Sequence, residues 1–187
     1  MMPLVERSMP KQRWQHTLGV VETAEALALR YGADAEKAKI AAVLHDAAKY
    51  WPMDKQRLTV EAAGDPAGVL RYDKELWHAH AGAIAAERDF EVDDPDILNA
   101  IRYHTSGREG MTMLEKIVCL ADYIEPGREF PGVDKLRELA KASVEKALIA
   151  GFDGTIAFLI EKGKRIYPLT VLARNDLIQS IPREVGE

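Results

Sequence analysis

The stretch AAVLHDAAKYW, residues 41–51, sets a histidine beside an aspartate in an otherwise apolar run. Its apolar spacing is that of an amphipathic helix, which Asp34 can cap and which we expect to end near Trp51. Adjacent helical residues point about 100° apart, so His45 and Asp46 can both reach one ion only near a helix end or at a crowded helix junction. The pair therefore predicts a polar site where helices meet.

The rest of the chain also has the signals of helices. Alternating strand patterns with two-residue hairpin turns are missing, and the one Asp153-Gly154 pair lies inside a helical pattern. Capping residues, prolines at helix starts and glycines just after helix ends predict further helices. These cover about residues 10–31, 53–63, 74–90, 94–104, 112–126, 132–140, 143–164 and 170–180. The loops are short and no Pro/Gly/Ser-rich linker divides the chain, which predicts a single all-α domain over residues 1–187.

The composition is that of a water-soluble protein. Of the 187 residues, 47% are hydrophobic and 29% charged, and the net charge of -5 gives no support to nucleic-acid binding through a basic surface. No segment approaches the roughly 20 apolar residues of a membrane span, and the N-terminus lacks a secretion signal. Cys119 is the only cysteine, which excludes an intrachain disulfide and fits a reducing compartment. We therefore expect a cytoplasmic protein without nucleic-acid or membrane partners.

Histidines and one further aspartate stand in apolar helical surroundings. Asp122 lies in the run IVCLADYIEP, where a lone carboxylate is costly unless it is paired or bound to a cation. Imidazole and carboxylate are ligands that suit iron, manganese, zinc and similar divalent ions. The residues that can reach His45 and Asp46 from other helices are His16, His78, His104 and Asp122.

Each of these residues also has a purely structural interpretation. A single histidine on an apolar helix face is more often a hydrogen-bonded core residue. Asp46 alone could cap a helix or pair with Lys49, and Asp122 alone could pair with an arginine. Cys119 is expected to be a buried core residue. Such residues on five separate helices are less easily explained one at a time, which favours a metal site.

The order of these residues resembles that of the HD-domain metal-dependent phosphohydrolases. More narrowly, six segments resemble the YqeK family: RWQHTLGVVETAEALALRYG, AAVLHDAAKYWP, LWHAHAGAIAAERDF, ILNAIRYHTSGR, EKIVCLADYIEPGREFPGV and YPLTVLARN. The resemblance covers about residues 10–175, and RYHTSGR and ADYIEPGREFPGV are its most specific strings. His80 departs from it, because it stands where the family's WHxP-like stretch has proline, and we treat His80 as a bystander.

The resemblance implies an HD-type helical bundle that cuts diadenosine tetraphosphate symmetrically into two ADP. It implies one or two iron ions, with manganese or another divalent metal as the alternative. The implied metal ligands are His16, His45, Asp46 and Asp122. The expected catalytic residues are Asp46, His78, His104 and Lys49. The expected substrate-binding residues are His16, Asp46, His78, His104, Thr105, Asp122, Arg128, Pro168, Thr170, Arg174 and Asn175.

Two cations are candidates for stabilising phosphate charge. Lys49 follows His45 by one turn, although a solvated lysine at a helix end has the same pattern. Arg128 lies in a Pro/Gly-bounded loop and offers a bidentate fork. Arg102 and Arg108, which flank His104, are weaker candidates of this kind.

Two other functions compete with this one. The first is HD-type hydrolysis of a different nucleotide, such as a nucleoside monophosphate, a cyclic dinucleotide or a guanosine polyphosphate alarmone. The lack of a Gly-Tyr-Pro segment beside a second His-Asp pair counts against the cyclic dinucleotide. The second is a nucleotide-binding regulatory module without turnover. In each case the expected partner is a small nucleotide, and a homodimer is a further expectation.

Overall fold

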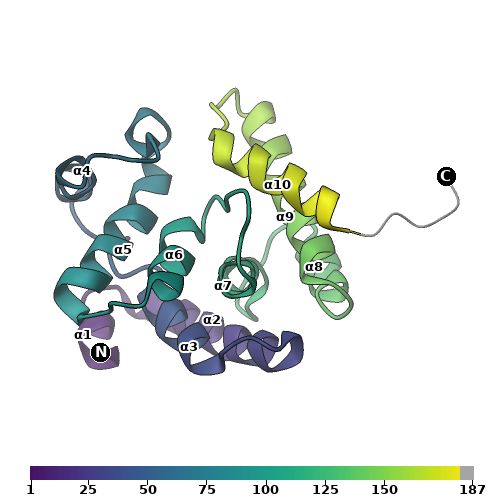
Figure 1. Ribbon diagram of the computed structural model, residues 1–187, viewed down its shortest axis with the longest axis horizontal. Coiled ribbons are helices and arrows are strands. Elements are labelled where there is room, and N and C mark those ends of the chain that lie inside the picture. The colour runs from purple at the N-terminus through teal and green to yellow at the C-terminus, as the bar shows by residue number, and fades with distance from the viewer. Residues whose placement is uncertain (182–187) are drawn as a thin grey trace, which may run out of the picture.

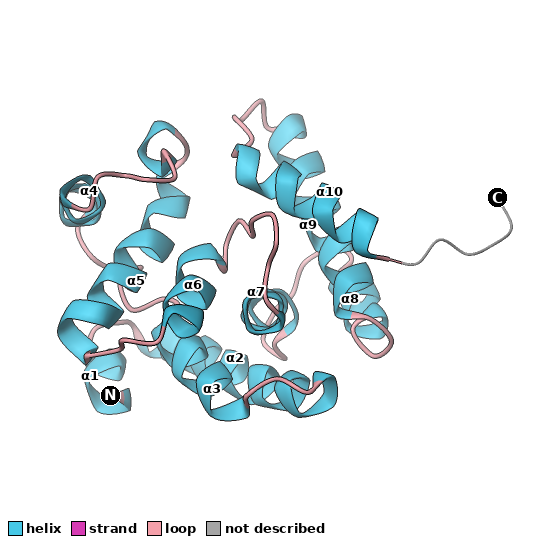
Figure 2. Ribbon diagram, in the orientation of Figure 1, coloured by secondary structure: helices cyan, strands magenta, loops and turns pink. Residues whose placement is uncertain are grey.

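The computed structural model describes residues 1–181, which form ten α-helices and two short 3-10 helices and no strand (Figure 1 and Figure 2). The predicted all-α fold is thereby confirmed. The α-helices are α1 (Met2–Arg7), α2 (Lys11–Tyr31), α3 (Ala35–Leu44), α4 (Met53–Ala62), α5 (Trp77–Phe90), α6 (Pro95–Tyr103), α7 (Met113–Ile124), α8 (Val133–Leu139), α9 (Val144–Glu161) and α10 (Pro168–Ser180). The 3-10 helices are η1 (Val69–Arg71) and η2 (Lys74–Leu76).

Helix α7 lies at the centre of the arrangement and appears end-on in Figure 1. It packs against α2 and α3, against α6, and against α9, while α10 lies along α9. Its apolar residues Ile117, Val118 and Leu120 are fully buried, which fits the apolar run read from the sequence. The helices on either side of α7 therefore share one core, and any polar residue on α7 is brought close to several of them.

The helix boundaries follow the capping signals of the sequence. Asp34 accepts hydrogen bonds from two backbone N–H groups of α3, and Asp94 does the same for α6. Thr112 accepts from the N–H of Glu115 at the start of α7, which is the first half of the predicted capping box, whereas the Glu115 carboxylate binds Arg108. Helix α2 ends at Gly32, whose φ of 71° is the left-handed conformation that glycine adopts without strain.

The prediction that the helix capped by Asp34 extends to near Trp51 is wrong, because this helix, α3, ends at Leu44. The His45 ring donates to the carbonyl of Ala42 at 2.6 Å and so satisfies one of the carbonyls that the helix end leaves free. Residues 45–50 then continue as turns with bonds three residues apart, such as Lys49 N to Asp46 O at 2.9 Å. His45 and Asp46 therefore lie just past a helix end, where both can face one site.

Several other boundaries differ from those predicted. Helix α1 was not expected, and α9 ends at Glu161 rather than near residue 164. Helix α10 begins at Pro168, two residues earlier than predicted, with proline at a position that needs no N–H donor. Residues 74–76 form η2 instead of the first turn of α5, because Asp73 caps this short segment separately.

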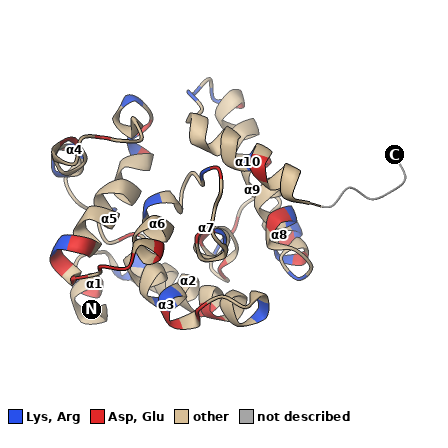
Figure 3. Cartoon of the chain, viewed as in Figure 1, with Lys and Arg blue, Asp and Glu red and all other residues tan. Residues whose placement is uncertain are grey.

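The surface carries charges of both signs. Figure 3 shows acidic and basic residues interspersed along α8 and along the segments near α3 and α6. No helix within residues 1–181 combines the length and the apolar character of a membrane span.

His80 on α5 is buried and lies against the Tyr103 ring, 5.9 Å away between ring centroids. Burial first, and then the nearby positive charge of Arg102, lower its pKa to about 4. Because the unfolded chain then binds more protons below pH 6.5 than the folded chain, stability falls as the pH drops toward 4. Between pH 7.5 and 5 we expect His80 to remove about 2 kcal/mol from the free energy of unfolding.

Urea unfolding of the metal-free protein at both pH values checks this expectation. In the His80→Gln variant the free energy of unfolding should fall by about 2 kcal/mol less between pH 7.5 and 5 than in the wild type, whatever the variant's stability at pH 7.5. An equal loss in the two proteins would show that His80 does not stay neutral in the fold.

Candidate metal centre

The six histidines and aspartates predicted to share one site converge in the structure. His16 comes from α2, His78 from α5, Asp122 from α7, and His104 is the residue that ends α6. His45 and Asp46 come from the turn after α3. Four of the six are at most 3% exposed, and the side chains of His16 and Asp122 are 11% and 19% exposed. The cluster is thus almost closed to solvent, with an opening on the side of α2 and α7.

Asp46 is the central residue of this cluster. Its Oδ1 lies 3.1 Å from His78 Nε2, and its Oδ2 lies 3.3 Å from His45 Nε2. Burial alone would raise the pKa of Asp46, but His45 and His78 hold that pKa well below its usual value. The buried carboxylate therefore keeps its negative charge.

Asp122 is the second carboxylate of the cluster. Its Oδ1 lies 3.0 Å from His16 Nε2 and 3.9 Å from His45 Nε2. Arg128 donates to the same oxygen and, at 2.6 Å, to the backbone carbonyl of Asp122. Burial opposes ionisation here too, yet His16 and Arg128 lower the pKa of Asp122. Two carboxylate charges are thus held side by side among the imidazoles.

Three of the histidines have their Nδ1 atoms engaged away from the cluster. His45 donates to the Ala42 carbonyl at 2.6 Å, and His104 donates to the Ile101 carbonyl at 2.7 Å. His16 Nδ1 lies 3.0 Å from Glu125 Oε1. A carbonyl oxygen only accepts, so the Nδ1 atoms of His45 and His104 carry hydrogen. In a neutral ring this arrangement leaves the Nε2 lone pair facing the cluster.

His78 is arranged differently from the other histidines. Its Nδ1 lies 3.4 Å from Lys49 Nζ, which also contacts Glu75 at 3.0 Å. A lysine ammonium only donates, so Nδ1 of His78 accepts and its Nε2 carries hydrogen. That Nε2 lies 3.1 Å from Asp46 Oδ1 and 3.3 Å from His104 Nε2. His78 is therefore a hydrogen-bond donor at the centre of the cluster.

The ligand atoms fit a bound divalent cation. The atoms offered by His16, His45 and Asp122 all lie within 4.8 Å of one another, as do those of His45, Asp46 and His104. Among the described residues, Nε2 of His16 and Nε2 of His45 are buried without a hydrogen-bond partner. An imidazole lone pair that faces a carboxylate oxygen at close range is unfavourable unless a cation lies between them. The donor set of nitrogen and oxygen suits iron, manganese, cobalt or zinc.

The remaining predicted site residues lie outside this cluster. Thr105 follows His104 directly and is half-buried, and Pro168, Thr170, Arg174 and Asn175 lie on α10. Arg174 pairs with Asp153 of α9 at 2.8 Å. Within residues 1–181 no hydrogen bond or ion pair joins any of these five residues to the cluster. The weaker candidate Arg108 binds both carboxylate oxygens of buried Glu115, which fixes the loop after α6.

Two residues that the sequence reasoning missed touch the cluster directly. Arg13 Nη1 lies 3.0 Å from Asp46 Oδ2, and Glu125, only 3% exposed, contacts His16. Arg13 precedes His16 by three residues on α2, and Glu125 follows Asp122 by three residues at the end of α7. Residues three apart share a helix face, so this spacing was the signal that could have identified both.

Comparisons with known proteins agree with this arrangement. The model of the HD domain family matches residues 13–127, which include all six residues of the cluster. A Bacillus subtilis protein named bis(5'-nucleosyl)-tetraphosphatase, symmetrical, is 47% identical over 93% of this chain and 94% of its own length. A protein of the same name from Halalkalibacterium halodurans is 45% identical over 94% of each chain.

A solved structure has the same fold. The crystal structure of a protein from Clostridium acetobutylicum, titled a predicted HD superfamily hydrolase involved in NAD metabolism, superposes with a TM-score of 0.91. Its sequence is 43% identical, and the match covers 96% of each chain. The whole helical arrangement, including α8 to α10 beyond the HD match, is therefore shared with a known protein.

Proposed function

Because the chain belongs to the HD domain family, we propose that its cluster of histidines and aspartates is a hydrolytic metal centre that cleaves dinucleoside tetraphosphates. The chain is a symmetrical bis(5'-nucleosyl)-tetraphosphatase, which splits diadenosine tetraphosphate into two ADP. The observation that carries this function is identity of 45–47% to two proteins of that name over nearly the full length of each. The buried cluster supplies the chemistry that the reaction needs.

The proposed metal ligands are His16, His45, Asp46 and Asp122. Their support is the short distances between them and the two buried Nε2 atoms without partners among the described residues. A bound divalent ion supplies a water of lowered pKa and a Lewis acid for phosphate oxygens. We propose iron, because the resemblance read from the sequence implies it, and one or two ions.

His78 and His104 are proposed to have different roles beside the metal. The pKa of His104 is lowered to about 3, first by burial and then by His45 and His78, so its ring is neutral. With Nδ1–H on the Ile101 carbonyl, His104 offers a lone pair and suits a ligand of a second ion. His78 offers Nε2–H and suits a donor to a phosphate oxygen.

Three cations contact residues of the cluster and are proposed to bind phosphate. Lys49 is held between Glu75 and His78, and its side chain is 22% exposed. Arg13 touches Asp46 and is 20% exposed, and Arg128 touches Asp122 and is 33% exposed. Each is anchored at one end and reachable from solvent, as a group that binds an incoming anion must be.

We propose that Thr105 and the α10 residues Pro168, Thr170, Arg174 and Asn175 bind the nucleoside part of the substrate. The support is that Thr105 adjoins His104, and that α10 meets the loop after Thr105 through the bond from Gly110 N to Asp176 at 3.0 Å.

We further propose a cytoplasmic homodimer. Free, buried Cys119 fits a reducing compartment. The support for self-association is a set of exposed apolar side chains on α9 and α10, namely Phe158, Ile160, Leu172 and Ile178.

A substrate panel tests the proposed activity against its two alternatives. One metal-loaded preparation is given diadenosine tetraphosphate, a nucleoside monophosphate, a cyclic dinucleotide and a guanosine polyphosphate. We expect kcat/KM for diadenosine tetraphosphate to exceed the others by about 100-fold or more, because another nucleotide would leave polar groups of the site unpaired. A higher value for another nucleotide would replace the substrate, and binding of nucleotides without turnover of any would favour the regulatory module.

A further inference from the structure

Glu125 is a buried carboxylate at the C-terminal end of α7 that makes two hydrogen bonds. Its Oε1 lies 3.0 Å from His16 Nδ1, and its Oε2 accepts from Gly127 N at 2.6 Å. The residue is 3% exposed. A carboxylate only accepts, so a hydrogen on Nδ1 of His16 is the partner that satisfies it. Both oxygens of this buried charge are thereby engaged.

The close approach of Glu125 to α2 depends on a glycine. A Cβ built on Gly19 would lie only 2.5 Å from Glu125 Oε2, well inside van der Waals contact. Gly19 follows His16 by three residues and so lies on the same face of α2. A side chain at this position would push the carboxylate away from His16 without altering any proposed metal ligand.

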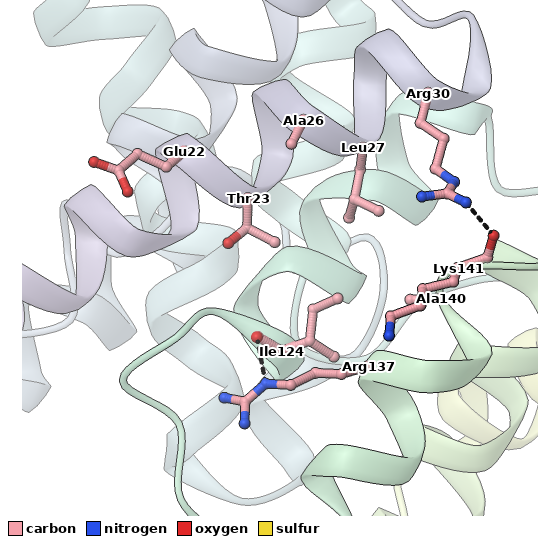
Figure 4. A pocket seen from close by; sticks show the side chains of 9 residues that line it. All are labelled: Glu22, Thr23, Ala26, Leu27, Arg30, Ile124, Arg137, Ala140 and Lys141. Carbon is pink, nitrogen blue, oxygen red and sulfur yellow. Dashed lines mark hydrogen bonds between the residues drawn. The ribbon is translucent and has the colours of Figure 1, made fainter.

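The backbone of Glu125 is fixed by a residue of another helix. Arg137 of α8 donates to the carbonyls of Ile124 at 3.1 Å, Glu125 at 2.9 Å and Arg128 at 3.0 Å. These carbonyls belong to the end of α7 and the loop after it, where helical partners are lacking. Figure 4 shows Arg137 reaching the Ile124 carbonyl beside a groove that α2 and α8 form. These bonds hold the backbone of Glu125 in place and so fix the position from which its side chain reaches His16.

We propose that Glu125 is a positioning residue that sets the tautomer and orientation of His16. With hydrogen on Nδ1 bound by Glu125, the lone pair of His16 is on Nε2, which lies 3.0 Å from Asp122 and 3.9 Å from Asp46. A carboxylate behind a ligating imidazole also makes the ring a stronger ligand. The inference rests on the metal centre of the proposed function and assigns Glu125 no contact with substrate.

A purely structural role for Glu125 makes a different prediction. If the carboxylate only accepts from Gly127 and holds the loop after α7, its loss lowers thermal stability but leaves the metal affinity of the folded protein unchanged. The affinity with which the metal-free protein binds added metal therefore distinguishes the two roles. This measurement does not depend on which nucleotide is the substrate.

The experiment titrates cobalt into metal-free protein in competition with a chelating dye and records the visible cobalt spectrum. We expect Glu125→Ala and Gly19→Ala to weaken binding by about 10- to 100-fold, the usual effect of losing the partner of a ligating histidine. Glu125→Gln should have an affinity between those of Glu125→Ala and the wild type, because its amide oxygen can accept from Nδ1 while its NH2 group then faces the N–H of Gly127. Altered cobalt spectra are expected for the first two variants.

Matched controls share the chemistry of each change. Glu22→Gln removes an exposed carboxylate elsewhere on α2, and Gly154→Ala adds a methyl group in α9 where nothing lies within 4 Å. Both should bind cobalt as the wild type does. If Glu125→Ala fails to fold, Gly19→Ala carries the test.

Two results would overturn the inference in distinguishable ways. Wild-type affinity and an unchanged spectrum in Gly19→Ala and in folded Glu125→Ala would reject the role of Glu125 alone. A wild-type protein that binds no divalent ion would reject the metal centre of the proposed function as well.

Discussion

Asp46→Asn is expected to lower kcat/KM for diadenosine tetraphosphate by about 1,000-fold. Asp46 is the residue that the other groups share, within 3.3 Å of His45, His78 and Arg13. Asparagine keeps the size but removes the charge that holds a divalent ion. An ion contributes several kcal/mol to the transition state, and each 1.36 kcal/mol is about tenfold in rate. Steady-state kinetics and metal content measured on one preparation check this expectation.

A matched control for this change is Asp134→Asn on α8. The side chain of Asp134 is 90% exposed, and this variant should have the activity and metal content of the wild type. An Asp46→Asn enzyme with normal metal content and a rate within tenfold of the wild type would contradict the central position given to Asp46.

Metal loading is expected to raise the melting temperature of the protein by about 5 to 10 °C. An ion at 100 times its dissociation constant adds about 2.7 kcal/mol to folding, and each kcal/mol shifts the melting temperature of a chain of this size by about 2–4 °C. The cause here is that the ion neutralises two carboxylates, Asp46 and Asp122, which are held among buried imidazoles. Differential scanning calorimetry with and without added metal measures the shift, and hydrolysis should stop in the chelated sample.

The same calorimetric scans distinguish an ion bound in the cluster from ions bound elsewhere on the protein. Asp46→Asn should lose most of the shift, whereas Glu22→Gln should keep all of it. An equal shift in wild type and Asp46→Asn would mean that the stabilising ion binds elsewhere.

The sequence predicted the fold largely through local signals. Asp34, Asp94 and Thr112 cap the helices that they were expected to cap, because capping depends on a few neighbouring atoms. The end of α3 could not be read in this way. It depends on a bond from the His45 ring to the Ala42 carbonyl, and apolar periodicity carries no sign of such a bond. The domain boundary at residues 1–187 stays a prediction.

The sequence predicted the six residues of the cluster but missed two charged residues that contact them. Six residues stood out as polar groups in apolar runs, and the structure brings all six together. Arg13 and Glu125 did not stand out, because charged residues near helix ends usually face solvent. Only the three-residue spacing from His16 and from Asp122 would have indicated them. The roles of the α10 residues remain predictions, since nucleotide contacts depend on the bound substrate.

The most direct test of the symmetrical, metal-dependent cleavage is the identity of the products that metal-loaded wild-type protein releases from diadenosine tetraphosphate. We expect ADP as the only nucleotide product, two per substrate, with no release after chelation and recovery when a divalent metal is restored. ATP and AMP in equal amounts, or ADP release that chelation leaves unchanged, would contradict it.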